Sequence, residues 1–403
     1  MKYVVILGDG MAGEPLEALN GKTTLEYAST PVMDYLAGCG EQGLVSNVPS
    51  SMQPGSDVAN LAVMGYDPEK NFSGRSPLEA LSVGVDMKMT DVIFRCNLVT
   101  LSEEEPYEEK TILDHSSGEI STQDADILMD AVRQAFDSEK FRFYTGTSYR
   151  HITVWDHGQV LELNPPHDHL GQKIAPWLPQ HPVFREMMKK SFDILNAHPL
   201  NRERAAKGLN KANSLWFWGA GTKPMLENFA QKTGLQGTMI SAVDLLKGIA
   251  VGAGMQTVDV PGATGSLDTN YEGKAQAAID ALLKNGQDFA YIHVEAPDEM
   301  GHQGNIFHKV RSIEYLDSRI LAPVKAALDA SGEPYRILLL PDHPTPIRAR
   351  THTREPVPYV LFDSRYQRKK VSRYSEREAA ATGSYEPHGS RMRARLLEQK
   401  EEM

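Results

Sequence analysis

The feature that most constrains the fold is a set of short, mainly apolar runs that alternate along the chain with amphipathic stretches. Each run is followed within a few residues by glycine, aspartate or proline. The runs are Val4–Leu7, Ala290–Val294, Ile337–Leu340 and Tyr359–Phe362. Runs of this length, bounded by turn-forming residues, are typical of strands that are buried on both faces of a sheet.

The stretches between these runs predict helices. Gly273–Lys284 and Val310–Ala330 place apolar residues close to helical spacing. Strands that alternate with helices form a mostly parallel sheet covered by helices on both faces. In such sheets the functional side chains gather at the carboxyl ends of the strands. We therefore expect an α/β fold whose chemistry lies where these runs end.

The middle of the chain has a different pattern, with shorter strands in which polar and apolar residues alternate. The elements expected there are the strands Val92–Arg95, His151–Trp155 and Val160–Leu163 and the helix Thr122–Phe136. This pattern predicts a smaller α+β domain inserted at residues 91–167. The larger domain would then consist of residues 1–90 and 168–403.

Composition and charge exclude several classes of protein. The 403 residues are 41% hydrophobic, enough for a substantial core, and 42 Lys+Arg against 53 Asp+Glu give a net charge of −11. An acidic surface repels nucleic-acid backbones, so we expect no nucleic-acid partner. No apolar run approaches the roughly 18 residues of a membrane span, so no membrane partner is expected. The short apolar N-terminal run and the presence of two cysteines indicate a cytoplasmic protein.

Four polar clusters stand at predicted strand ends or at the start of a predicted helix, Val58–Met64. They are Gly8-Asp9-Gly10, Pro54-Gly55-Ser56-Asp57, the pair Asp298 and His302, and Asp342-His343 with His352 further along. Each cluster has an ordinary structural interpretation, such as an Asp-Gly turn, a serine helix cap or a capping aspartate near a surface histidine. Four residues separate the aspartate and histidine of the third cluster, so on a helical turn they would share a face.

Taken together, the clusters predict a site for two metal ions. They supply three aspartates, three histidines and one serine: Asp9, Asp298, Asp342, His302, His343, His352 and Ser56. Carboxylate oxygens and imidazole nitrogens suit Mn²⁺, Zn²⁺, Co²⁺ or Mg²⁺. Two such ions can hold the attacking and leaving oxygens of a phosphoryl transfer, and a serine beside them can act as nucleophile.

In this order the residues resemble those of the alkaline phosphatase superfamily, and nearly the whole chain resembles the archaeal-type, cofactor-independent phosphoglycerate mutases. The matching stretches include GDGMAG at Gly8, PGSDVANLAVMGYDP at Pro54, GRSPLEA at Gly74, EAPDEMGHQG at Glu295 and PDHPTPIRARTHTREPVPY at Pro341. The resemblance implies an alkaline-phosphatase-like sheet with an inserted smaller domain.

The resemblance also implies how the metal ligands divide. Around one ion it places Asp9, Ser56, Asp342 and His343, and around the other Asp298, His302 and His352. Ser56 would be the nucleophile that becomes phosphoserine. We expect two divalent ions, with Mn²⁺ preferred and Zn²⁺, Co²⁺ or Mg²⁺ as alternatives, and no requirement for 2,3-bisphosphoglycerate.

The expected substrate is a small phosphorylated acid, whose anionic groups need cations or N–H donors. Family-like stretches supply Arg75, Arg95, Arg150 and Lys247 as candidates, with surface ion pairs as the alternative for each arginine. Asp114 or His151 would move protons between the glycerate hydroxyls. The sequence makes no prediction of oligomeric state.

The implied reaction interconverts 3-phosphoglycerate and 2-phosphoglycerate through phosphoserine, with the inserted domain excluding water as a lid. Three alternatives stay open: a homoserine kinase-like phosphotransferase of the same family, a metal-dependent phosphomonoesterase, and a non-catalytic binding protein on a decayed phosphatase fold. All seven metal-site positions retain Ser, Asp or His, which disfavours the last.

Overall fold

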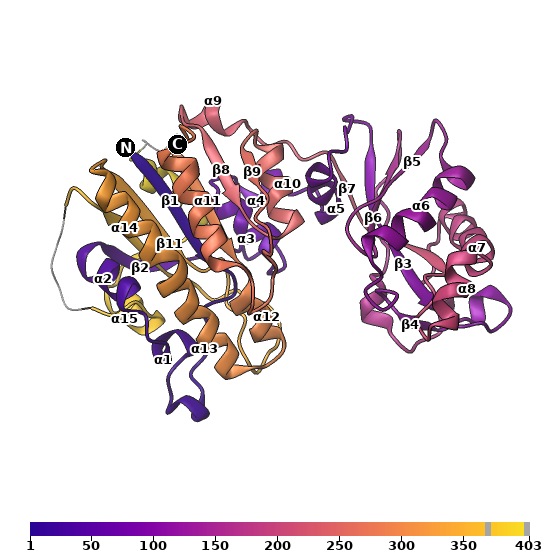
Figure 1. Cartoon of the computed structure of the whole chain (residues 1–403), viewed down its shortest axis with the longest axis horizontal. Coiled ribbons are helices and arrows are strands. Elements are labelled where there is room, and N and C mark those ends of the chain that lie inside the picture. The colour runs from indigo at the N-terminus through magenta and orange to yellow at the C-terminus, as the bar shows by residue number, and fades with distance from the viewer. Residues whose placement is uncertain (367–371, 399–403) are drawn as a thin grey trace. The chain divides into compact units, whose positions relative to one another are not determined.

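The computed structural model describes residues 1–366 and 372–398 and divides into two compact units (Figure 1). Unit 1 consists of Met1–Phe72 and Met225–Met403, and unit 2 of Ser73–Pro224. Among the described residues, no helix has the length and apolar character needed to cross a membrane.

Unit 1 is built on an eight-stranded, mostly parallel sheet with the order β13-β2-β12-β11-β1-β10-β8-β9. Its strands are β1 (Lys2–Gly8), β2 (Glu41–Val45), β8 (Gly237–Ile240), β9 (Gln256–Val258), β10 (Phe289–Val294), β11 (Tyr335–Leu340), β12 (Val357–Asp363) and β13 (Tyr385–Glu386). Strand β12 runs antiparallel to both of its neighbours, β11 and β2. The four apolar runs are β1, β10, β11 and β12, so the predicted α/β sheet is confirmed.

The register of the three central strands aligns their carboxyl ends. Gly8 of β1 lies opposite Val294 of β10, and Leu7 lies opposite Leu340 of β11. Side chains on the residues that follow these strands therefore emerge at one edge of the sheet.

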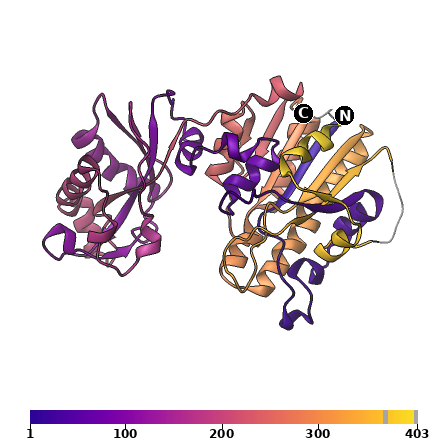
Figure 2. The ribbon, with the colours of Figure 1, turned by 180° about the vertical axis from the view of Figure 1, so that it is seen from behind.

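Helices cover both faces of this sheet. In Figure 1, α11, α13 and α14 lie across one face, and Figure 2 shows the purple segment around α3 and the yellow α16 across the other. The helices of unit 1 are α1 (Thr24–Tyr27), α2 (Pro31–Cys39), α3 (Ser56–Val63), α4 (Pro68–Asn71), α9 (Phe229–Thr233), α10 (Asp244–Gly252), α11 (Tyr271–Leu283), α12 (Ala296–His302), α13 (Ile306–Tyr315), α14 (Ala322–Ser331), α15 (Glu376–Ala381) and α16 (Met392–Leu397).

The predicted helix Val310–Ala330 corresponds to α13 and α14, joined without a break by a π-helical stretch, Leu316–Leu321. Pro323 lies in the first turn of α14. Proline has no N–H to donate to the preceding turn, and a widened π turn is one way in which a helix accommodates that loss.

Unit 2 contains a five-stranded antiparallel sheet centred on β3. Strand β3 pairs with β4, β6 and β7, and β5 pairs with β6. The strands are β3 (Val92–Leu101), β4 (Ile112–Asp114), β5 (Phe141–Tyr144), β6 (Arg150–Trp155) and β7 (Ser214–Thr222), and the helices are α5 (Arg75–Ser82), α6 (Thr122–Phe136), α7 (Pro182–Asn196) and α8 (Pro199–Ala206). A core of its own includes Phe94, Phe184, Trp216 and Phe217.

Unit 2 is larger than the insertion expected at residues 91–167. Strand β7 returns to pair along most of β3, and α5 packs against both strands, so residues 73–224 form one cluster of contacts. The two connections to unit 1 are adjacent, because the Thr222 N–H donates to the Ser73 carbonyl at 3.3 Å.

The predicted strand Val160–Leu163 is wrong. These residues form no strand, and Val160 is exposed. Leu161 and Leu163 pack on the core of unit 2 as side chains only. Two prolines, Pro165 and Pro166, follow at once and have no N–H to donate to a neighbouring strand.

Candidate metal centre

Seven predicted side chains of unit 1 converge at the aligned carboxyl ends of β1, β10 and β11. Asp9 follows β1, Asp298 and His302 lie on α12 directly after β10, and the pair Asp342-His343 follows β11. His352 is in the loop before β12, and Ser56 is the first residue of α3. The sequence prediction that these residues meet at one edge of the sheet is what the structure shows.

One group of ligand atoms surrounds Ser56. The Ser56 Oγ lies 3.1 Å from the His343 Nε2 and 3.3 and 3.4 Å from the two carboxylate oxygens of Asp9. His343 Nε2 is 3.5 Å from Asp9 Oδ1 and 3.3 Å from Asp342 Oδ2. Asp9, Asp342 and His343 thus present atoms close enough to bind one ion.

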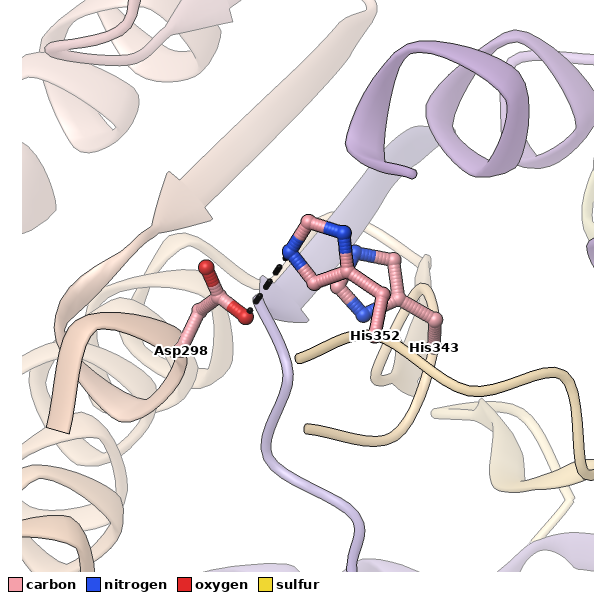
Figure 3. Close-up of side chains that lie close together, drawn as sticks. All are labelled: Asp298, His343 and His352. Atoms are coloured by element: carbon pink, nitrogen blue, oxygen red, sulfur yellow. Dashed lines mark ion pairs between the residues drawn. The ribbon is translucent and has the colours of Figure 1, made fainter. Parts of the chain in front are cut away.

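A second group contains Asp298 and the other histidines. Asp298 Oδ2 is 3.1 Å from His302 Nε2, and Asp298 Oδ1 is 3.4 Å from His352 Nε2. The two histidine Nε2 atoms are 3.0 Å apart. Figure 3 shows Asp298 facing His352, with His343 beside it.

His343 belongs to both groups. Its ring centroid is 4.2 Å from that of His352, and it can share an ion with Asp298 and His352 as well as with Asp9 and Asp342. The resemblance placed it with the first group alone.

The charges of this centre fit divalent cations. Burial, together with the neighbouring Asp342 and Asp298, raises the pKa of Asp9 well above its usual value. Carboxylates crowded in this way are stabilised by a bound cation. Imidazole nitrogens that face each other at 3.0 Å, as in His302 and His352, need a proton or a cation between them. A donor set of carboxylate oxygens and imidazole nitrogens suits Mn²⁺ or Zn²⁺.

A glycine permits this close packing. Gly10 has φ +58°, and a Cβ there would come within 2.6 Å of the Asp298 Oδ1. Any other residue at position 10 would combine an unfavourable backbone conformation with a collision against a candidate ligand.

A surrounding layer of polar side chains orients the candidate ligands. Asn60 donates from Nδ2 to Asp342 Oδ2 at 2.9 Å and to the Ser56 carbonyl at 2.8 Å, and the Tyr291 hydroxyl donates to Asn60 Oδ1 at 2.7 Å. This network joins the helix that begins with Ser56 to the loop that holds Asp342.

Three further polar residues complete that layer. His293 Nε2 lies 2.9 Å from Asp9 Oδ2, and the Thr345 hydroxyl donates to Asp298. Lys309 donates to the carbonyls of Thr345 and Ala12 at 2.7 and 3.2 Å. Sequence reasoning missed these residues; the available signal was a histidine inside the otherwise apolar run Ala290–Val294.

The predicted arginines lie in unit 2. Arg75 Nε is 3.0 Å from Glu79 Oε1, and the buried Arg95 also pairs with Glu79. Burial raises the pKa of Glu79, but the two arginines outweigh it and hold the pKa below its usual value. Two guanidinium groups and one carboxylate give this trio a net charge of +1. Arg150, at the start of β6, is exposed and lies against the Tyr149 ring.

An aromatic ring, that of Trp218, lies beside Arg95. The Arg95 guanidinium is 5.2 Å from the centre of the Trp218 ring, and the His167 ring packs edge-on against Trp218 and His115. Burial lowers the pKa of His167; the neighbouring Asp168 opposes this shift, and His115, Arg75 and Arg95 add to it.

The remaining three predicted residues are all engaged in local contacts. Asp114 accepts hydrogen bonds from Ser116, Gly118 and Asn210. His151 is fully buried, its Nδ1 accepts the Gly146 N–H at 3.2 Å, and burial lowers its pKa to about 3. Lys247, on α10 of unit 1, is 2.6 Å from Asp259.

Comparison with known proteins identifies the family. A family model described as 2,3-bisphosphoglycerate-independent phosphoglycerate mutase matches residues 37–201. The protein of that name from Methanosarcina acetivorans is 46% identical over 389 residues, which cover 95% of this chain and 96% of the relative. The Methanosarcina mazei relative is 48% identical over 367 residues and 90% of each chain. This chain belongs to the cofactor-independent phosphoglycerate mutase family.

Two solved structures are similar to this chain over nearly its whole length, which includes both units. The PH0037 protein from Pyrococcus horikoshii superimposes with a TM-score of 0.82 at 28% identity, covering 100% of this chain and 98% of the other. The cofactor-independent phosphoglycerate mutase from Thermoplasma acidophilum has a TM-score of 0.66 at 25% identity, covering 99% of each chain.

Proposed function

We propose that this protein interconverts 3-phosphoglycerate and 2-phosphoglycerate without added bisphosphoglycerate. The observation that carries the proposal is the position of Ser56, whose Oγ lies within 3.4 Å of Asp9 and His343 at the meeting point of three carboxylates and three histidines. Relatives that align with 90% or more of this chain are named 2,3-bisphosphoglycerate-independent phosphoglycerate mutase, which supports the proposal.

Two divalent ions, with Mn²⁺ preferred, would be held by the seven side chains of the centre. We assign Asp9, Ser56, Asp342 and His343 to one ion and Asp298, His302 and His352 to the other, with His343 close enough to serve both. When bound, the ions would neutralise phosphoryl charge and favour loss of the Ser56 hydroxyl proton.

The chain's own residues would carry out two transfers. In the first, Ser56 Oγ bonds to phosphorus while the bond from phosphorus to the C3 oxygen breaks, leaving phosphoserine and glycerate. In the second, the C2 oxygen of glycerate bonds to phosphorus and the Ser56 Oγ leaves. Asn60 would hold the start of α3 in place through the Ser56 carbonyl during both steps.

Cationic side chains are proposed to hold the carboxylate and phosphate of the substrate. The candidates are Arg75, Arg95 and Arg150 of unit 2 and Lys247 of unit 1. Glu79 holds the Arg75 and Arg95 side chains close together, which supports the first two. Asp114 or His151 remains the predicted proton carrier. The inserted domain, predicted at residues 91–167, remains the predicted means of excluding water.

The test is an enolase-coupled assay. Metal-stripped protein is supplied with Mn²⁺ and 3-phosphoglycerate, with no bisphosphoglycerate. We expect turnover in the wild type and a loss of at least about a thousandfold in Ser56→Ala, since a nucleophile has no substitute. Ser51→Ala removes an exposed hydroxyl nearby in sequence and is the matched control.

Other outcomes would contradict the proposal. Full turnover in Ser56→Ala would remove the phosphoserine step. Release of inorganic phosphate alone would identify a phosphomonoesterase. Absence of both products would direct the assay to homoserine with a phosphoryl donor, the kinase-like alternative.

A further inference from the structure

Strand β10 carries a histidine in the middle of the unit 1 sheet. His293 has no exposed surface and lies opposite Leu7 of β1 in the strand register. A buried imidazole needs partners for both ring nitrogens. Its Nε2 is 2.9 Å from Asp9 Oδ2, and its Nδ1 is 3.2 Å from the Ser241 Oγ. Ser241 directly follows β8, which pairs with β10.

The carboxylate of Asp9 determines which nitrogen carries the proton. An ionised carboxylate only accepts hydrogen bonds, so the ring proton resides on the Nε2 that faces Asp9, and Nδ1 is an acceptor. The Ser241 Oγ accepts the Val243 N–H at 3.0 Å and can donate its own hydroxyl hydrogen to His293 Nδ1. With the other tautomer, two lone pairs would face each other at 2.9 Å.

Burial lowers the pKa of His293, and a neighbouring positive charge adds to this effect. Lys274 is fully buried and donates from Nζ to the His293 carbonyl at 3.1 Å. A second positive charge on the imidazole would be repelled by this ammonium. His293 is thus a neutral donor with one fixed N–H.

The His293 N–H donates to Asp9, a carboxylate that also contacts His343 and Ser56. Asp9 Oδ1 lies 3.5 Å from His343 Nε2, and both oxygens of Asp9 are within 3.4 Å of the Ser56 Oγ. A hydrogen bond at Oδ2 fixes the plane of the carboxylate and directs Oδ1 toward His343.

We infer that His293, oriented by Ser241, is a positioning residue that fixes the Asp9 carboxylate for metal binding beside Ser56. The inference rests on the proposed two-metal function. It assigns a role to two residues, His293 and Ser241, that are not among the seven candidate ligands.

The test measures Mn²⁺ binding, in the absence of substrate, by titration calorimetry of the metal-stripped full chain. His293→Met and His293→Gln form a matched pair, because the two side chains have similar size and shape but only glutamine offers an N–H. We expect one of the two Mn²⁺ sites to be weakened about 10- to 100-fold in His293→Met, and to stay within about threefold of the wild type in His293→Gln.

Two further variants complete the design. Ser241→Ala removes the group that orients the ring, so we expect a smaller loss of affinity at the same site. Thr238→Val is the control, because Thr238 is equally buried in the same sheet and its hydroxyl has no hydrogen-bond partner among the described residues. We expect it to bind Mn²⁺ as the wild type does.

The possible results distinguish a role of the His293 N–H from a mere effect on packing. They also distinguish failure of this inference from failure of the proposed function. Wild-type affinity in His293→Met, or equal losses in His293→Met and His293→Gln, would overturn the role of the N–H. If His293→Met does not fold, wild-type affinity in Ser241→Ala would overturn it instead. A wild type that binds two Mn²⁺ but has no mutase turnover would contradict the proposed function and leave this inference standing.

Discussion

Lys309 places a positive charge in the interior of unit 1, next to the candidate metal centre. Its side chain has no exposed surface, and its ammonium group joins the loop after β1 to the loop after β11 through the carbonyls of Ala12 and Thr345. Burial lowers the pKa of this lysine to about 8. Lys309 therefore adds side-chain hydrogen bonds to the backbone contact between the two loops that carry Asp9 and Asp342.

We expect Lys309→Met to lower the free energy of unfolding by about 2–4 kcal/mol. The methionine fills most of the space but leaves the buried Thr345 carbonyl without a donor, which costs about 1–3 kcal/mol. The Ala12 carbonyl keeps the Thr345 N–H as a donor and loses one of its two hydrogen bonds, worth about 0.5–1.5 kcal/mol. Urea unfolding followed by circular dichroism measures the change. Lys70→Met is the control because Lys70 is largely exposed and should have little effect. Equal stabilities of the two variants would show that the buried ammonium is dispensable.

His151 makes the stability of unit 2 dependent on pH. Burial holds its pKa at about 3 in the folded protein, below the ordinary value of 6.5. Between these values the unfolded chain binds a proton that the folded chain does not. The contribution of His151 is therefore complete above pH 6.5 and is lost as the pH falls toward 3, by up to about 1.4 kcal/mol per pH unit.

Urea unfolding of the wild type and His151→Asn at several pH values between 7 and 5 measures this effect. Asparagine can accept the Gly146 N–H but does not titrate. We expect the wild type to lose stability more steeply than the variant as the pH falls. Parallel curves would mean that His151 is protonated in the folded state.

Among the elements, the strands of the sheet centre were predictable and those near its edges were not. The strands β1, β10 and β11 are buried on both faces, so their sequences are mainly apolar and easily recognised. By contrast, β2 has the sequence EQGLV, begins with an exposed glutamate and then alternates between half-buried and buried positions. It lies beside the two-residue strand β13. A polar strand of five residues that contains glycine carries little signal of its own.

Long-range pairing also escaped the sequence prediction. Strand β7 returns to β3 after more than 100 residues, so nothing local to Ser214–Thr222 shows that it belongs with the insertion. The helix Thr122–Phe136 was predicted with its observed bounds, because an N-cap at Ser121 and an amphipathic pattern are both local signals.

The candidate metal centre also contains residues that the sequence predicted and contacts that it did not. Asp9, Asp298 and Asp342 follow directly on strand ends, so the rule for parallel sheets brought them together. The contacts from His293 to Asp9 and from Asn60 to Asp342 join residues more than 280 positions apart. Those contacts depend on strand order and register, which local sequence does not specify.

At the scale of the whole molecule, the residues of the candidate metal centre all belong to unit 1. Unit 2 has a separate core, and its two connections meet where Thr222 N–H donates to the Ser73 carbonyl. Unit 1 should therefore keep its metal centre when residues 73–224 are replaced by a short linker.

We expect this shortened chain to bind two equivalents of Mn²⁺ and to lack mutase turnover, because the three candidate arginines are removed with unit 2. Metal analysis after gel filtration and the enolase-coupled assay measure the two properties. Loss of Mn²⁺ binding in a shortened chain that is still folded would show that unit 2 supplies a ligand.

The adjacent connections of unit 2 also bear on how such a gene could be assembled. A segment whose two ends lie side by side can enter or leave a host coding sequence in one recombination event, without separating strands that pair in the host sheet. All eight strands of the unit 1 sheet lie outside Ser73–Pro224 in the sequence. The ancestry of the two units can therefore be traced separately, by building one phylogenetic tree from each and comparing their branching orders.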